Sequence, residues 1–169
     1  IFYVNFGYLF YLKYFLCYYI FSWEHIMETK VAINKRRSIR KYKDISVDEN
    51  VVLDILNCGR LAPSAKNRQP WRFVAILDKT FIHKIADTII KNFSEEDELI
   101  SKQLLNANPS VISTANIIKK APILILIYKE IHSYWEISDS LSIGACIQNM
   151  CLRACELKLG TLWIRDTFY

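Results

Sequence analysis

A polar loop that contains two prolines, residues 62–70, most strongly constrains how this chain folds. Pro63 and Pro70 fix their own φ angles and disfavour a helical conformation at the residue before each of them. An amphipathic helix that precedes the loop must therefore end before Pro63, and a hydrophobic strand begins near Phe73. The loop is a conformationally restricted connection between a helix and a strand.

The side chains of this loop suit a polar ligand. Ser64 carries a hydroxyl, while Asn67 and Gln69 carry amides, and each of these groups can donate and accept hydrogen bonds without charge. Uncharged groups of this kind match the edge of a heterocycle. The alternative is an ordinary connecting loop whose amides cap the preceding helix, because polar residues are common in loops.

A basic segment, residues 35–42, is the second candidate site. If the segment is extended, its side chains alternate, so that Arg36, Ser38 and Arg40 share one face and Arg37 lies on the other. A guanidinium group matches phosphate oxygens in pairs and stays charged at physiological pH. The segment is therefore a candidate phosphate site. The alternative is a solvated basic patch or a weak nucleic-acid contact.

Three motifs in this order resemble the FMN-dependent nitroreductase family: RRSIRKY at 36–42, APSAKNRQPWRF at 62–73, and SIGACIQNM through LGTLWI within 142–164. The resemblance covers residues 28–169. It implies an α+β fold with a central mixed, mainly antiparallel sheet flanked by helices. It also implies FMN bound noncovalently at a homodimer interface, with NAD(P)H as electron donor and a nitroaromatic, a quinone or a related small molecule as acceptor.

The resemblance assigns roles to residues of both segments. Those of the basic segment would hold the FMN phosphate, and those of the polar loop would contact the flavin or ribityl chain, usually from the partner subunit. No side chain is expected to be catalytic, because the flavin itself carries the hydride. The cofactor-binding residues implied are Arg36, Arg37, Ser38, Arg40, Pro63, Ser64, Asn67 and Gln69.

The few glycines and the spacing of the cysteines argue against glycine-rich nucleotide-binding motifs and metal sites. Only four glycines occur, so the chain has no glycine-rich dinucleotide fingerprint and no phosphate-cradling Walker loop. The five cysteines show no Cys-x-x-Cys pair and no metal-finger spacing. We therefore expect free thiols in a reducing cytoplasm and no metal site. The formal charge of +5 lies partly at the phosphate site and does not require nucleic acid.

The first 26 residues differ from the rest, because they hold six of the ten tyrosines and five of the nine phenylalanines. The run is long enough to span a bilayer as a helix. However, its tyrosine hydroxyls suit hydrocarbon poorly, and it lacks the features of a signal peptide. We expect residues 1–26 not to be native coding sequence and the native start to be Met27, with a membrane anchor as the alternative. Residues 27–169 are predicted to be one nitroreductase-like domain that lacks its C-terminal part.

Periodicity predicts the elements of this domain. A capping box at 46–49 starts a second helix, and Gly160 is expected to end the last helix in a left-handed cap. The apolar run at 122–128 predicts a central strand covered on both faces, and residues 94–113 form either a cover over the site or a surface helix and loop. The other predicted helices are 28–36, 79–93 and 139–157, and the other strands are 73–77 and 161–164.

The alternative function, from another class, is a small basic module in which residues 36–41 bind polyanions without flavin. Such a module would be colourless, and its binding would weaken as the salt concentration rises. A flavoprotein would instead be yellow.

Overall fold

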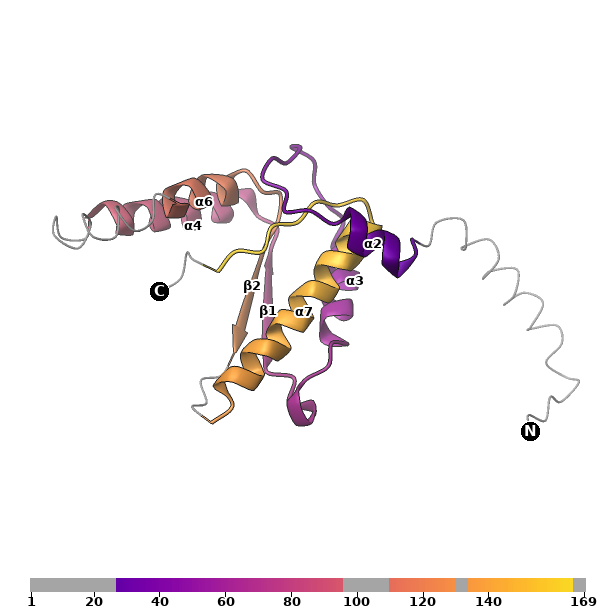
Figure 1. Ribbon diagram of the computed structural model, residues 1–169. Helices are drawn as coiled ribbons and strands as arrows, with labels where there is room; N and C mark the ends of the chain where they lie inside the picture. The colour runs from indigo at the N-terminus through magenta and orange to yellow at the C-terminus, as the bar shows by residue number, and fades with distance from the viewer. Residues whose placement is uncertain (1–26, 96–109, 130–133, 166–169) are drawn as a thin grey trace, which may run out of the picture.

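The computed structural model describes residues 27–95, 110–129 and 134–165. The predicted helices at the start of the domain, after the loop and near the end are confirmed with small shifts of their bounds. Figure 1 shows the elements, which are α2 (Thr29–Lys35), α3 (Glu49–Arg60), the short 3-10 helix η3 (Ala65–Asn67), β1 (Trp71–Ile76), α4 (Lys79–Glu95), α6 (Ser110–Lys119), β2 (Leu124–Lys129) and α7 (Glu136–Glu156).

The two strands pair antiparallel, with Trp71 opposite Lys129 and Ile76 opposite Leu124. Because side chains alternate along a strand, β2 contributes to two separate clusters. Its odd-numbered isoleucines pack with α3 and α7, whereas its even-numbered leucines pack with α4 and α6. This arrangement confirms an α+β fold in which helices flank a mainly antiparallel sheet.

One apolar cluster lies between α3, α7 and the start of β1. Its buried members include Ile55, Trp71, Cys146 and Met150. Gly59 lets the two helices approach, because a Cβ atom there would lie 2.7 Å from Met150 Cγ and 3.1 Å from Cys146 Sγ. The second cluster joins α4 to α6 through Ile76, Ile82, Ala86, Ile89, Val111, Ala115 and Ile118.

Two predicted helix ends are wrong in detail. Asp48, not Ser46, caps α3, because the Asp48 carboxylate accepts a hydrogen bond from the Asn50 backbone N–H at 2.8 Å. Gly160 does not form the left-handed cap of α7, since Lys158 takes that conformation with φ of 61°. The backbone N–H of Lys158 bonds the Cys155 carbonyl and that of Leu159 bonds the Ala154 carbonyl, which is the Schellman pattern.

One strand prediction is confirmed and one needs correction. Helices pack on both faces of β2, as predicted, although its residues are only partly buried and Tyr128 is 53% exposed. Residues 161–164 do not form a strand in the described part of the chain, where Thr161 makes a single parallel bridge to Ser38. Of the segment 94–113, α6 begins at Ser110, and residues 96–109 lie outside the described residues, as do residues 1–26.

Candidate functional site

The polar loop has an unusual backbone. Lys66, Asn67 and Gln69 have φ angles of 49°, 54° and 48°. Among the described residues these are three of the four non-glycine residues with positive φ. Such conformations cost on the order of 1–3 kcal/mol each and persist only when the surroundings enforce them. The loop is therefore held in place by its neighbours.

Hydrogen bonds inside the loop involve all three predicted polar side chains. The Ser64 hydroxyl accepts a bond from the Gln69 backbone N–H at 3.0 Å, and the Gln69 amide donates to Asn67 Oδ1 at 3.1 Å. Asn67 and Gln69 are exposed, as is Pro63, while Ser64 is half-buried. Each amide keeps a second polar atom that this bond does not use. The loop thus presents hydrogen-bonding capacity to the outside.

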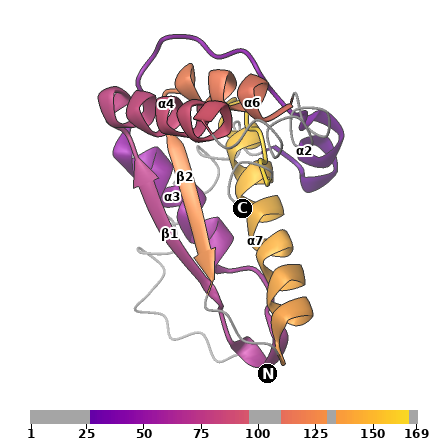
Figure 2. The same cartoon turned by 90° about the vertical axis from the view of Figure 1, so that its left-hand side faces the viewer.

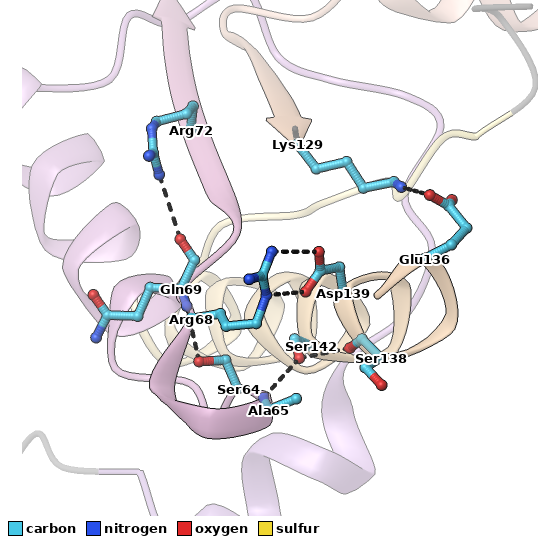
Figure 3. A network of polar contacts seen from close by, with 10 residues as sticks. All are labelled: Ser64, Ala65, Arg68, Gln69, Arg72, Lys129, Glu136, Ser138, Asp139 and Ser142. Carbon is cyan, nitrogen blue, oxygen red and sulfur yellow. Dashed lines mark hydrogen bonds and ion pairs between the residues drawn. The ribbon is translucent and has the colours of Figure 1, made fainter. Parts of the chain in front are cut away.

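The loop is anchored on the first two turns of α7 (Figure 3). Arg68 makes a two-pronged ion pair with Asp139, with Nε–Oδ1 and Nη2–Oδ2 distances of 3.2 and 3.4 Å. The Ser142 hydroxyl accepts a bond from the Ala65 N–H at 3.3 Å and donates to the Ser138 carbonyl at 2.7 Å. The Lys129–Glu136 ion pair ties the end of β2 to the same end of α7.

Trp135, directly before α7, contacts two cations of the loop. Lys66 Nζ lies 5.3 Å and Arg68 Cζ 5.0 Å from its ring centroid. Both distances lie in the range of cation–π attraction. Tyr134 meets the Trp135 ring edge-on with 5.0 Å between centroids.

Sequence reasoning assigned no role to Arg68, Asp139 or Ser142. The sequence does contain a pattern that points to Asp139. Asp139, Ser142 and Cys146 are spaced at i, i+3 and i+7 and so line one face of α7. All three are buried. A carboxylate on the apolar face of a helix requires a partner, since an unpaired buried charge is costly.

The basic segment after α2 is extended beside the chain that follows α7. The Ile39 N–H donates to the Thr161 carbonyl at 2.9 Å, and the Tyr42 hydroxyl donates to the Ile39 carbonyl at 2.8 Å. Burial raises the pKa of Tyr42, and the nearby charge of Arg40 partly opposes this. Ser38 and Arg40 are exposed. Ser38 therefore lies in a parallel bridge with Thr161, and the Tyr42 hydroxyl holds the carbonyl of the next residue.

The arginines of this segment have different surroundings. Arg37 donates to the carbonyls of Asn34 and Arg36 at 2.7 and 2.8 Å, so its guanidinium lies against the end of α2. Arg40 donates to the Ser38 carbonyl at 3.3 Å. Arg36 is half-buried.

Gly160 allows the segment to lie close to the chain after α7. A Cβ atom on Gly160 would lie 2.8 Å from Ile39 Cγ1 and 2.9 Å from Ile39 Cβ. Glycine is needed here for close approach, because Gly160 does not have a positive φ angle. The position of Ile39, and with it that of Ser38 and Arg40, depends on this missing side chain.

The structure does not bring the two candidate sites together within one chain. The loop contacts Ser142 near the start of α7, whereas the Cys155 thiol near its end lies 3.8 Å from the Ala32 carbonyl of α2. The intervening helix spans roughly 20 Å at 1.5 Å per residue. Figures 1 and 2 both show η3 and α2 at opposite ends of α7.

The described residues contain no group of three or more His, Cys, Asp or Glu side chains that could hold a metal ion. Cys58, Cys146, Cys151 and Cys155 are free, and burial raises the pKa of the Cys146 thiol to about 11. In the same residues, none of the helices has the length and apolarity needed to cross a membrane.

Comparison with known proteins shows which family this chain resembles. The family model described as the nitroreductase family matches residues 33–169. A protein of Methanothermobacter thermautotrophicus, provisionally named an NADH dehydrogenase/NAD(P)H nitroreductase, is 29% identical over 142 residues, which are 81% of this chain and 60% of that protein. Human iodotyrosine deiodinase 1 is 33% identical over 139 residues, which are 69% of this chain and 46% of that protein.

Solved structures share the fold. A structure from Desulfovibrio desulfuricans, provisionally named a nitroreductase and solved in complex with FMN, matches with a TM-score of 0.61 and 29% identity, covering 84% of this chain and 70% of that one. The expected nitroreductase-like fold is therefore confirmed. The chain spans about half to three fifths of the length of the two sequence relatives.

Proposed function

Because this chain belongs to the nitroreductase family, we propose that it is an FMN-dependent oxidoreductase that takes electrons from NAD(P)H and passes them to a small acceptor such as a nitroaromatic or a quinone. The FMN complex of a similar structure and the nitroreductase name of a relative support the cofactor and the donor. The observation that carries the proposal is the polar loop, whose enforced backbone presents the amides of Asn67 and Gln69 outward. Bound flavin supplies the hydride and electron transfer.

The residues present fit FMN. Arg36 and Arg40 bring permanent positive charge to the extended segment, and Ser38 between them adds a hydroxyl donor. These groups suit the oxygens of a phosphate. Asn67 and Gln69 offer donors and acceptors without charge, which suits the polar edge of the isoalloxazine ring.

We propose that the complete site forms in a homodimer. The two groups of residues lie at opposite ends of α7, so the phosphate segment of one chain would meet the polar loop of its partner. The outward face of α7 supports this arrangement, because Ile137 and Leu141 are 78% and 71% exposed at i, i+4 spacing. Exposed apolar patches commonly mark protein interfaces. A cytoplasmic location is part of the proposal and rests on the free thiols.

A visible spectrum of the purified protein tests the proposal. We expect bound oxidised flavin, and flavin reduction by NADH or NADPH followed by reoxidation with a nitroaromatic, a quinone or iodotyrosine. Iodotyrosine is included because deiodinases are among the relatives. A colourless protein that does not take up added FMN, but binds polyanions in a salt-sensitive way, would establish the alternative of a basic binding module.

The amide groups of the loop provide a residue-level prediction. Replacing Asn67 or Gln69 by alanine should weaken the binding of FMN and of riboflavin alike, because both ligands contain the isoalloxazine ring. A lost neutral hydrogen bond costs about 0.5–1.5 kcal/mol, or about two- to tenfold in Kd. Flavin fluorescence titration measures both constants.

Asn116→Ala is the matched control, since Asn116 is an exposed amide on α6 that bonds the Ile112 carbonyl at 2.9 Å. It should leave flavin binding unchanged. If the loop variants melt earlier without FMN yet bind it normally once folded, the amides are scaffolding rather than ligand contacts.

A further inference from the structure

We propose that Asp139 and Arg68, supported by Trp135, are positioning residues that hold the polar loop in the conformation presenting Asn67 and Gln69. The inference rests on the proposed flavin function, because it assigns these groups a role at that site. Arg68 belongs to the loop, whereas Asp139 on α7 and Trp135 directly before α7 contact the loop through it. None of the three needs to contact the ligand.

The first argument is the burial of the pair. Asp139 is 1% exposed, and its ion-pair partner Arg68 lies 71 residues earlier in the chain. Asp139 therefore gains the partner that a buried carboxylate needs only if Arg68 keeps its place in the loop. The two-pronged contact also fixes the orientation of the guanidinium, which a single bond would not.

The second argument is the alternation along the loop. Ala65, Lys66 and Arg68 each contact the α7 region, through Ser142, Trp135 and Asp139. Asn67 and Gln69, the neighbours of Arg68, are exposed, as is Lys66. Both flank Arg68 and both have positive φ. Holding Arg68 thus enforces the backbone on its two sides.

The third argument is that one turn of helix carries the anchors. The Asp139 N–H donates to the Trp135 carbonyl at 2.7 Å, so the carboxylate and the indole are presented together. If the pair is broken, Asn67 and Gln69 can relax toward negative φ, which non-glycine residues prefer. Their amides would then point elsewhere.

The test compares Asp139→Asn, which keeps the shape and removes the charge, with Asp87→Asn. Asp87 is the control because it pairs with Lys119 at 2.7 Å on the surface. We expect Asp139→Asn to weaken binding of both FMN and riboflavin about tenfold, since hydrogen bonds to charged groups contribute on that scale. The reduction potential of the bound flavin should shift as well. Asp87→Asn should change neither quantity.

Trp135 provides a rescue experiment. Trp135→Ala should weaken flavin binding, whereas Trp135→Phe should restore most of it, because phenylalanine keeps an aromatic face for the two cations. If Asp139→Asn fails to fold, Arg68→Lys replaces it, since lysine keeps the charge beside Asp139 and loses the two-pronged geometry. Wild-type flavin affinity and potential in the folded variants would overturn the inference.

A measurement without flavin separates this inference from the proposed function. The Gln69 N–H is bonded to the Ser64 hydroxyl at 3.0 Å only while the loop keeps its shape. Hydrogen exchange at Gln69 should accelerate in Asp139→Asn and not in Asp87→Asn. If the wild type binds no flavin, the proposed function fails, and unchanged exchange at Gln69 would independently refute the positioning role.

Discussion

Replacing both Arg36 and Arg40 by alanine is expected to weaken FMN binding at least about a hundredfold and to leave riboflavin binding nearly unchanged. The two ligands differ by the phosphate, and each charge-assisted hydrogen bond to it contributes about 1.5–3 kcal/mol. The loss of two such bonds corresponds to an increase of more than about a hundredfold in the Kd for FMN. Parallel fluorescence titrations with FMN and riboflavin measure the difference.

The control removes the same amount of charge elsewhere. Arg60 and Lys84 are exposed cations at the end of α3 and on α4. The double variant Arg60→Ala/Lys84→Ala should bind FMN nearly as well as the wild type, apart from a small salt-dependent effect. Equal weakening of FMN and riboflavin in the Arg36/Arg40 variant, or an equal loss in the control, would refute the phosphate assignment.

Sequence patterns predicted the elements whose determinants are local. The positions of α3, α4 and α7 follow from apolar residues recurring at helical spacing, such as Val52, Ile55 and Gly59 in α3. Pro63 correctly marked the end of that helix, which stops at Arg60. These features depend on neighbours within a few residues along the chain.

Other features depend on contacts between distant residues. Lys158, rather than Gly160, takes the left-handed conformation because Leu157 and Leu159 on either side of it pack into the cluster of α3 and α7. That burial offsets the cost of the conformation, which is roughly 1 kcal/mol or more for a non-glycine residue. Turn preferences alone favour glycine, so the sequence pattern pointed to the wrong residue.

In the candidate site, too, the features with local determinants could be predicted and those that depend on distant residues could not. The polar side chains of the loop were recognisable, but its anchors were not, because the partner of Arg68 is Asp139 on a different element. The local sequence places Asp139 on the apolar face of α7 and so indicates that its carboxylate needs a partner, but it does not identify Arg68 as that partner. The loop and the basic segment are separated by the length of α7. The sequence could not predict this separation, because both motifs fit the same cofactor and neither shows where the other lies.

Gly160 and Gly144 offer a matched pair in which the same substitution should have opposite effects. Gly160→Ala is expected to destabilise the protein by about 1–3 kcal/mol, as overpacking typically does. The new Cβ would lie 2.8–2.9 Å from Ile39 atoms close to its backbone, so rotation of the side chain cannot relieve the contact. At Gly144, inside α7, the nearest atom is Trp163 Cη2 at an ordinary 3.6 Å.

Gly144→Ala should therefore be neutral or stabilising by about 0.5–1 kcal/mol, because alanine is the better helix former. Urea unfolding of the apoproteins measures both changes. Gly160→Ala should also weaken FMN binding more than riboflavin binding, since displacing Ile39 moves Ser38 and Arg40 with it. If Gly160→Ala proves as stable as Gly144→Ala and binds FMN normally, the close approach of the two segments does not position the phosphate site.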